Sequence, residues 1–143
     1  HVISYLPTNE DLLAVFRNAR AHLEPGALFA FDFWYGPAVL RDPPAARLKE
    51  ARLDGAHILR RAAPEIDSAK NIVDVHYHFE VTPPGGAPPF SFSETHRMRY
   101  LFGTELELLC AIAGFEPVLL SEWLADPPAP PSSWNGYFMA RAR

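Results

Sequence analysis

The first part of the chain places its apolar residues at the spacing of a helix. Thr8 precedes the pattern as a candidate N-cap, and the acidic pair Glu10-Asp11 favours the positive end of the helix dipole. The dipeptide Pro25-Gly26 ends the pattern. The apolar positions that recur with the helical period are Leu12, Leu13, Phe16, Ala19 and Leu23. This pattern predicts one amphipathic helix between Thr8 and Pro25.

An almost wholly apolar run follows this helix. Residues Ala27 to Phe33 contain one polar side chain, Asp32, and continue into Trp34-Tyr35 before Gly36-Pro37. A run of this length directly after a helix is typical of a strand that is buried on both faces, as in a parallel sheet. We therefore expect a buried strand with aromatic side chains at its carboxyl end.

The middle third of the chain changes to the period of β-strands. Residues 47–53 and 57–62 carry weak strand signals, whereas residues 71–81 alternate cleanly between apolar and polar side chains. A proline- and glycine-rich turn at 83–88 leads to a second long strand at 90–102. On the alternating strand one face carries Val73, Val75, Tyr77, Phe79 and Val81, and the other carries Asp74, His76, His78 and Glu80. This third predicts antiparallel β-structure.

The last third returns to helix and strand. Thr104 and Glu107 form a candidate capping box, and Gly114 stands where a helix ends. The helical apolar stripe is expected from Leu108, Leu109, Ile112 and Ala113, with Cys110 as a small buried residue on the same helix. Strands are expected at 117–124 and 134–142, on either side of a proline-rich loop at 126–133. The order predicts an open α/β sheet with an appended β region.

Composition narrows the class of protein. The chain has 143 residues, enough for one domain, and 48% of them are hydrophobic. With 13 basic against 17 acidic residues the net charge is −4, which argues against a nucleic-acid partner. No apolar run approaches the length of a membrane span. The single cysteine excludes an internal disulfide and fits a reducing, cytoplasmic location.

The order of these segments resembles the carboxyl-terminal half of a class I S-adenosylmethionine-dependent methyltransferase, in the branch that methylates small molecules such as sugar amines. Residues 1–5 resemble the end of that family's fourth strand and the loop after it, and residues 31–37 its loop towards the substrate. Leu23-Glu24-Pro25-Gly26-Ala27 is similar to the family's turn before the fifth strand, with Ala27 in place of a glycine. The resemblance also rests on segments 94–100, 108–115, 118–123 and 134–141.

The resemblance implies a partial Rossmann-like sheet in three parts. Residues 1–40 would supply the end of the fourth strand, a helix and the fifth strand, and 103–143 the last helix and a terminal β hairpin. Residues 41–102 would form an antiparallel β insert that acts as a substrate flap. The family's glycine-rich loop and ribose-binding acid have no counterpart here. We therefore expect the chain, which opens on His1, to be part of a longer protein that holds most of the cofactor site upstream.

The resemblance also implies roles for individual residues. The cofactor would be S-adenosylmethionine, with His1, Val2 and Ile3 as its contacts on this chain. Tyr5 and His1 would be the catalytic candidates, because a residue of this loop acts like a base in sugar-methylating relatives. The substrate contacts would be Asp32, Phe33, Trp34, Tyr35, His96, Arg97 and Arg99.

The residues themselves leave alternatives open. Aromatic side chains at the end of a buried strand suit a pocket wall or a cage for a cation, and equally a core beneath the β insert. Asp32 can orient a substrate hydroxyl or amine, or cap the strand end. His96, Arg97 and Arg99 can line a cavity, or pair with acidic side chains across strands. His76 and His78 have the spacing of metal ligands, but alternation on a half-exposed strand explains them, and no metal is predicted.

Two functions follow as hypotheses. The first is transfer of a methyl group to an amine or hydroxyl of a small molecule. The second is a non-catalytic binding or oligomerisation module with the same fold. If the chain stands alone, an exposed apolar sheet edge predicts that it forms a homodimer or aggregates.

Overall fold

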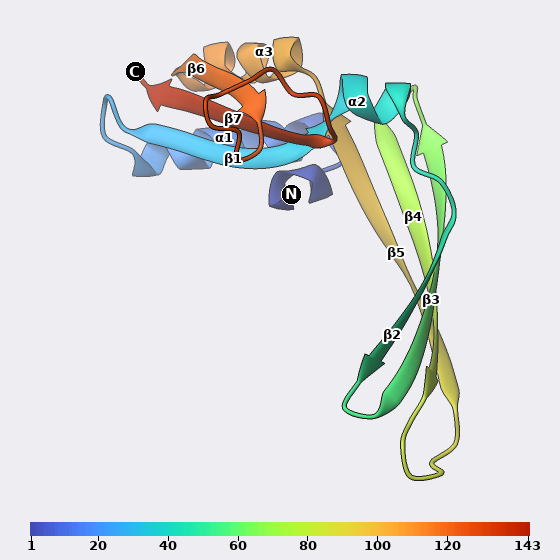
Figure 1. Ribbon diagram of the computed structural model, residues 1–143. Helices are drawn as coiled ribbons and strands as arrows, with labels where there is room; N and C mark the ends of the chain where they lie inside the picture. Colours follow the sequence, from blue (N-terminus) through green and yellow to red (C-terminus); the bar gives the residue numbers. More distant parts are fainter. The chain divides into compact units, whose positions relative to one another are not determined.

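The computed structural model describes all 143 residues as two compact units (Figure 1). Residues 1–43 and 98–143 form the first, here called the core unit, and residues 44–97 form the second, the strand unit. Strand β5 (Phe90–Leu101) is shared, because the boundary at residue 97 falls within it. No helix is both long and apolar enough to cross a membrane.

The core unit combines a mixed sheet with short helices. Besides β5 it contains strands β1 (Leu28–Tyr35), β6 (Phe115–Glu122) and β7 (Asn135–Ala142). The strand order is β5-β1-β7-β6, and β7 runs antiparallel to both of its neighbours. β1 pairs in parallel with β5 only at its carboxyl end, where Trp34 faces Tyr100. The helical elements of this unit are the 3-10 turn η1 (Val2–Tyr5), α1 (Asn9–His22), α2 (Gly36–Arg41) and α3 (Gly103–Ala113).

The secondary structure of the first five residues and the burial of the first strand differ from those predicted from the sequence. Residues 2–5 form the η1 turn and not the end of a strand, because the amide of Leu6 bonds back to the carbonyl of Ile3. β1 is not buried on both faces: its odd-numbered residues pack into the core, while Leu28 and Ala30 are exposed. Its main partner is antiparallel β7, which follows it over seven residue pairs. Residues 31–37, expected as a loop towards the substrate, are instead the end of β1 and the first two residues of α2.

Helix α1 begins and ends where the sequence predicts. The Thr8 hydroxyl accepts a hydrogen bond from the amide of Asp11 at 3.1 Å, which satisfies one of the free donors of the first turn. Leu12 and Phe16 point inward and are fully buried. The edge of the Phe16 ring meets Phe29 and Phe115 at centroid distances of 5.4 and 6.2 Å. Burial of each such side chain stabilises the fold by about 1.5–3 kcal/mol.

Helix α3 starts earlier than predicted. Its first residue is Gly103, and the carboxylate of Glu105 accepts a hydrogen bond from the amide of Phe102 at 3.3 Å, so the proposed box of Thr104 and Glu107 is wrong. The buried stripe is also shifted, because Leu108 and Ile112 are exposed. The side chains that α3 buries are Leu106, Leu109, Cys110 and Ala113. Gly114 ends the helix in the left-handed region at φ 84°, as expected.

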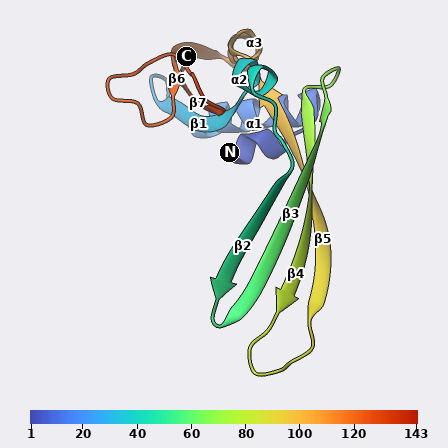
Figure 2. The same ribbon diagram turned by 45° about the vertical axis from the view of Figure 1, so that its right-hand side comes forward.

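The strand unit consists of antiparallel strands, as predicted for the middle of the chain (Figure 2). Its order is β2-β3-β4-β5, with β2 at Arg47–Leu53, β3 at Ala56–Asp67 and β4 at Ile72–Thr82. β2 and β3 are joined by the two-residue turn Asp54-Gly55, and both turn residues have positive φ, 49° and 80°. This geometry matches the right-handed twist of the paired strands.

Candidate functional site

The N-terminal turn is fixed against the carboxyl end of β1. The hydroxyl of Ser4, which is fully buried, accepts a hydrogen bond from the amide of Trp34 at 3.0 Å. His1 Nδ1 lies 3.0 Å from Asp32 Oδ2. Figure 1 shows η1 next to β1, with the amino terminus beside it. Within the core unit the structure thus pairs two predicted site residues, His1 and Asp32, and bonds Ser4, the residue before Tyr5, to the backbone of Trp34.

The side chains of η1 differ in their exposure. Ile3 is buried in the core, whereas Val2 is 83% exposed and Tyr5 is 49% exposed. A 3-10 turn separates residues by about a third of a rotation, so buried and exposed side chains follow one another closely. Ile3 and Ser4 hold the turn in place, whereas the side chains of Val2 and Tyr5 lie largely at the surface.

The three aromatic residues at the end of β1 have different surroundings. Phe33 is completely buried in the hydrophobic core, and its ring leaves no space for a side chain at Gly136, where an added Cβ would lie 2.8 Å away. Tyr35 is partly buried against the same core. Trp34 lies on the other face and contacts Trp134 at a centroid distance of 5.3 Å. Trp34 is half-buried and, unlike Phe33 and Tyr35, lies outside the hydrophobic core cluster.

Trp134 ties two further segments to this end of the sheet. Its indole N–H donates to the carbonyl of Asp42 at 3.0 Å. Arg41 of α2 donates to the carbonyl of Ser132, in the loop that precedes β7. Because both bonds lie in the core unit, α2 and the loop before β7 are held near the carboxyl end of β1.

Arg99 serves as an internal clamp. Its side chain is 8% exposed and donates to the carbonyl of Pro7 at 3.2 Å, to Asn9 Oδ1 at 2.8 Å and to the carboxylate of Glu105. These bonds join the start of α1 to the start of α3. A substrate contact for Arg99 stays a prediction, and the structure shows its guanidinium bound to protein groups.

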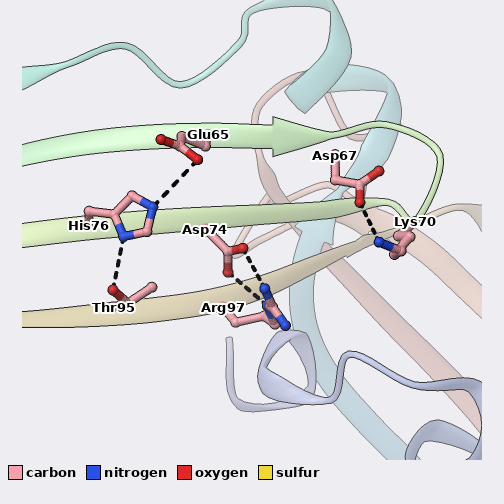
Figure 3. A network of polar contacts seen from close by, with 7 residues as sticks. All are labelled: Glu65, Asp67, Lys70, Asp74, His76, Thr95 and Arg97. Carbon is pink, nitrogen blue, oxygen red and sulfur yellow. Dashed lines mark hydrogen bonds and ion pairs between the residues drawn. The ribbon is translucent and has the colours of Figure 1, made fainter.

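His96 and Arg97 belong to β5. Arg97 holds Asp74 of β4 through two parallel hydrogen bonds of 2.8 and 2.7 Å (Figure 3). The hydrogen bond and charge of Arg97 lower the pKa of Asp74, and Asp74 in turn raises the pKa of Arg97. His96 Nε2 lies 3.0 Å from Glu94 Oε1. Arg97 therefore shows the cross-strand pairing that was the alternative to a substrate role, whereas His96 contacts a carboxylate of its own strand. A substrate role for either residue stays a prediction.

The polar face of the strand unit carries histidines bonded to hydroxyl groups. His76 Nδ1 contacts Thr95 Oγ1 at 2.9 Å and its Nε2 lies 3.7 Å from Glu65 (Figure 3). His78 Nδ1 contacts Ser93 Oγ at 2.9 Å. No group of three or more His, Cys, Asp or Glu side chains is arranged to hold a metal ion.

Cys110 is buried in α3, and burial raises the pKa of its thiol to about 11. A thiol with so high a pKa is almost fully protonated near neutral pH and is a poor nucleophile. This agrees with the interpretation of Cys110 as a packing residue.

No protein-family model and no curated protein matches the chain. Several solved structures, in contrast, are similar to this chain. The sugar N-methyltransferase KedS8 from Streptoalloteichus is 18% identical with a TM-score of 0.78, over 99% of this chain and 53% of that one. An S-adenosylmethionine-dependent methyltransferase from Clostridium acetobutylicum is 15% identical with a TM-score of 0.77, and the match covers 98% of this chain and 54% of that one. The amino pentose methyltransferase CalS10 from Micromonospora echinaspora is 19% identical with a TM-score of 0.74, and the match covers 99% of this chain and 54% of that one.

The chain has a class I methyltransferase fold. The resemblance drawn from the sequence is confirmed at the level of the fold, since these likenesses extend over nearly the whole chain. The chain spans only about half the length of each of these structures.

Sequence reasoning missed several residues that hold segments of the core unit together. Ser4 and Trp134 anchor the segments around the end of β1, and Glu105 anchors Arg99. Glu122 is bonded to Ser132 and Ser133 across the proline-rich loop. Ser4 and Trp134 belong to no periodic pattern, because each is positioned by a contact with a residue distant in the chain. The capping role of Glu105 was the one recognisable signal, since it stands three residues after the helix N-cap.

Proposed function

We propose that the chain is the carboxyl-terminal portion of an S-adenosylmethionine-dependent methyltransferase that methylates an amine or hydroxyl group of a small molecule. The supporting observation is the likeness, over 98–99% of the chain, to three structures described as methyltransferases. Two of them are described as acting on sugars, which favours a small polar acceptor. The proposal assigns to residues outside this chain most of the cofactor site.

The residues of η1 suit one edge of the cofactor. Val2 offers an exposed apolar side chain that can cover a purine ring, and the imidazole of His1 lies beside it in the chain. Ile3 supports them from the core. When bound, S-adenosylmethionine supplies a methyl group already activated on a sulfonium, so the protein's task is to orient the acceptor and receive its proton.

Tyr5 is the candidate base. About half of its surface is exposed, and Ser4, the preceding residue, fixes the backbone of the turn to β1. In the proposed reaction the phenolate oxygen of Tyr5 takes the proton that the acceptor loses and becomes the neutral phenol. His1, held 3.0 Å from Asp32, is the second candidate for that role.

The acceptor would lie along the carboxyl end of β1. The carboxylate of Asp32 would orient an amine or hydroxyl, and Trp34 and Tyr35 would wall the pocket, with Phe33 as support from beneath. Arg99, which belongs to the core unit, is proposed to line the acceptor beside β1. A substrate contact for His96 and for Arg97, which belong to the strand unit, stays a separate prediction. This location agrees with the rule that ligands of open α/β sheets bind outside the carboxyl ends of the strands.

Calorimetric titration of S-adenosylhomocysteine tests this function. The ligand would be added to this chain and to a version extended upstream in its parent gene. Binding by the extended version alone is the expected result. Binding by neither version would overturn the proposal and favour a non-catalytic module that shares the fold alone.

A variant of the extended protein tests the role of Tyr5. Removal of a general base lowers a reaction rate by about 10²–10⁴-fold, so Tyr5→Phe is expected to reduce methyl transfer by that order. Its affinity for S-adenosylhomocysteine should be unchanged. Full activity in Tyr5→Phe would transfer the role to His1, which His1→Gln would then examine.

A further inference from the structure

A hollow of about 330 Å³ lies at the end of the β6–β7 hairpin, within the core unit. Its lining includes Leu119 and Glu122 of β6, Tyr137 of β7, and Trp123, Leu124 and Pro128 of the connecting loop. Trp123 and Leu124 are 41% and 81% exposed, so the hollow is open to solvent. None of these residues was assigned to methyl transfer above.

Glu122 is the one charged residue that lines the hollow, and it has no cationic partner. Its carboxylate accepts hydrogen bonds from the amides and hydroxyls of Ser132 and Ser133. All of these donors are neutral, and no Lys, Arg or His forms an ion pair with Glu122. Burial raises its pKa, but the bonds from Ser133 and Ser132 outweigh that effect and lower it. The hollow therefore carries one uncompensated negative charge.

Two aromatic rings accompany this charge. Trp123 and Tyr137 contact each other at a centroid distance of 5.6 Å with their planes tilted by 57°. The negative faces of such rings attract cations, and Trp is the strongest of the aromatic side chains in this respect. Leu119, Leu124 and Pro128 add apolar surface that an inorganic ion, with its tightly held water, would not use.

We propose that this hollow is a binding site for a small organic cation, a substituted ammonium whose alkyl groups contact Trp123 and Tyr137 and whose charge is balanced by Glu122. An anion is excluded by the carboxylate, and a neutral apolar molecule leaves the charge of Glu122 uncompensated. This site is independent of the proposed methyl transfer and does not require the cofactor.

Choline and its neutral analogue 3,3-dimethylbutan-1-ol test the charge requirement directly, because they share one shape. The protein contains three tryptophans, and Trp123→Leu identifies the indole N–H signal of Trp123 in a ¹H–¹⁵N spectrum. Choline is expected to shift that signal saturably and to bind about tenfold more tightly than the alcohol, given the energies of cation–π contacts and of a nearby carboxylate. Equal affinities, or no shift with choline, would overturn the proposal.

Two variants assign the selectivity to Glu122. Glu122→Gln removes the charge and keeps an oxygen that can accept from the serines, and Glu116→Gln, on the same strand outside the hollow, is the matched control. Glu122→Gln is expected to bring the ratio of the affinity for choline to the affinity for 3,3-dimethylbutan-1-ol close to one. Glu116→Gln is expected to leave this ratio unchanged. A ratio compares two ligands in one variant, so a general change in the shape of the hollow does not produce this result. Retention of the full ratio in Glu122→Gln would refute the assignment.

Discussion

For Asp74 and Arg97, the sequence predicts the type of interaction, a cross-strand ion pair, but not which two residues form it. The alternation of β4 and β5 placed acidic and basic side chains on predictable faces, and cross-strand pairing between them was one of the two interpretations. Which carboxylate meets which guanidinium depends on the register of the two strands, and no residue in either strand specifies it locally. The bidentate contact between Asp74 and Arg97 is a result of that register.

The pH dependence of stability provides a test at this scale. Arg97 lowers the pKa of Asp74 in the folded protein, so the ionised carboxylate stabilises the fold at pH values above its ordinary pKa. That contribution is expected to disappear as the pH falls through the lowered pKa of the folded state. Urea unfolding of the protein and of Asp74→Asn between pH 2 and 7, about the range in which carboxylates titrate, measures it.

The two proteins should differ in free energy of unfolding at neutral pH and converge at the acidic end. Glu107→Gln is a suitable control, because Glu107 makes no ion pair and lies on α3. A constant difference between the protein and Asp74→Asn across the range would contradict the role given to the ion pair.

At the scale of elements, strong periodicity was a good guide and the ends of helices were not. The helix of residues 9–22 and the alternating strand at 72–82 were anticipated because many residues share in each pattern. The start of α3 was misplaced because Thr104 is a common capping residue, whereas the actual N-cap, Phe102, has no capping side chain. The α2 segment was missed because six residues carry too little periodic signal.

Gly114 offers a test of how α3 ends. Its φ of 84° is costly for residues with a Cβ, and an added Cβ would meet only Arg20 at 3.6 Å, an ordinary contact. Gly114→Ala should therefore lower the free energy of unfolding by about 1–2 kcal/mol through backbone strain alone. Thermal or urea unfolding measures this loss.

Asn visits the left-handed region more readily than Ala, so Gly114→Asn is the matched comparison and should lose less stability. Equal losses in the two variants would show that a steric contact, and not the backbone conformation, determines the effect.

At the scale of the whole molecule, the fold class followed from the order of segments, but the arrangement of the site did not. The resemblance to methyltransferases rested on the succession of helix, strand, β region, helix and hairpin, and that succession is what the structure and its likenesses confirm. The contacts around the end of β1 join residues up to 92 positions apart, such as Trp134 and Asp42. Local patterns carry no information about contacts of that range.

We expect the protein to associate with a second copy of itself. In the strand unit Phe79 and Phe92 stack at 4.7 Å, and the neighbouring Phe90 and Phe92 are 54% and 46% exposed. Exposed aromatic surface of this kind favours association with a second copy. Sedimentation velocity over a range of concentrations should show a dimer or larger species, and the double variant Phe90→Ser/Phe92→Ser should shift it towards monomer.

Leu108 and Ile112, exposed on α3, provide the control pair. Their replacement by serine should leave the association unchanged if the aromatic surface of the strand unit is responsible. A protein that sediments as a monomer at every concentration would contradict the expectation.

The position of β7 has a consequence for how the core unit is completed during synthesis. β7 is the last strand along the chain, yet it lies between β1 and β6 and bonds to both. Residues 28–35 thus leave the ribosome about a hundred residues before the strand that pairs with most of their length, a delay of about 5–20 s at ordinary rates of translation. During that interval the phenylalanines of β1 lack their partner strand, which makes the nascent chain a natural client for a chaperone.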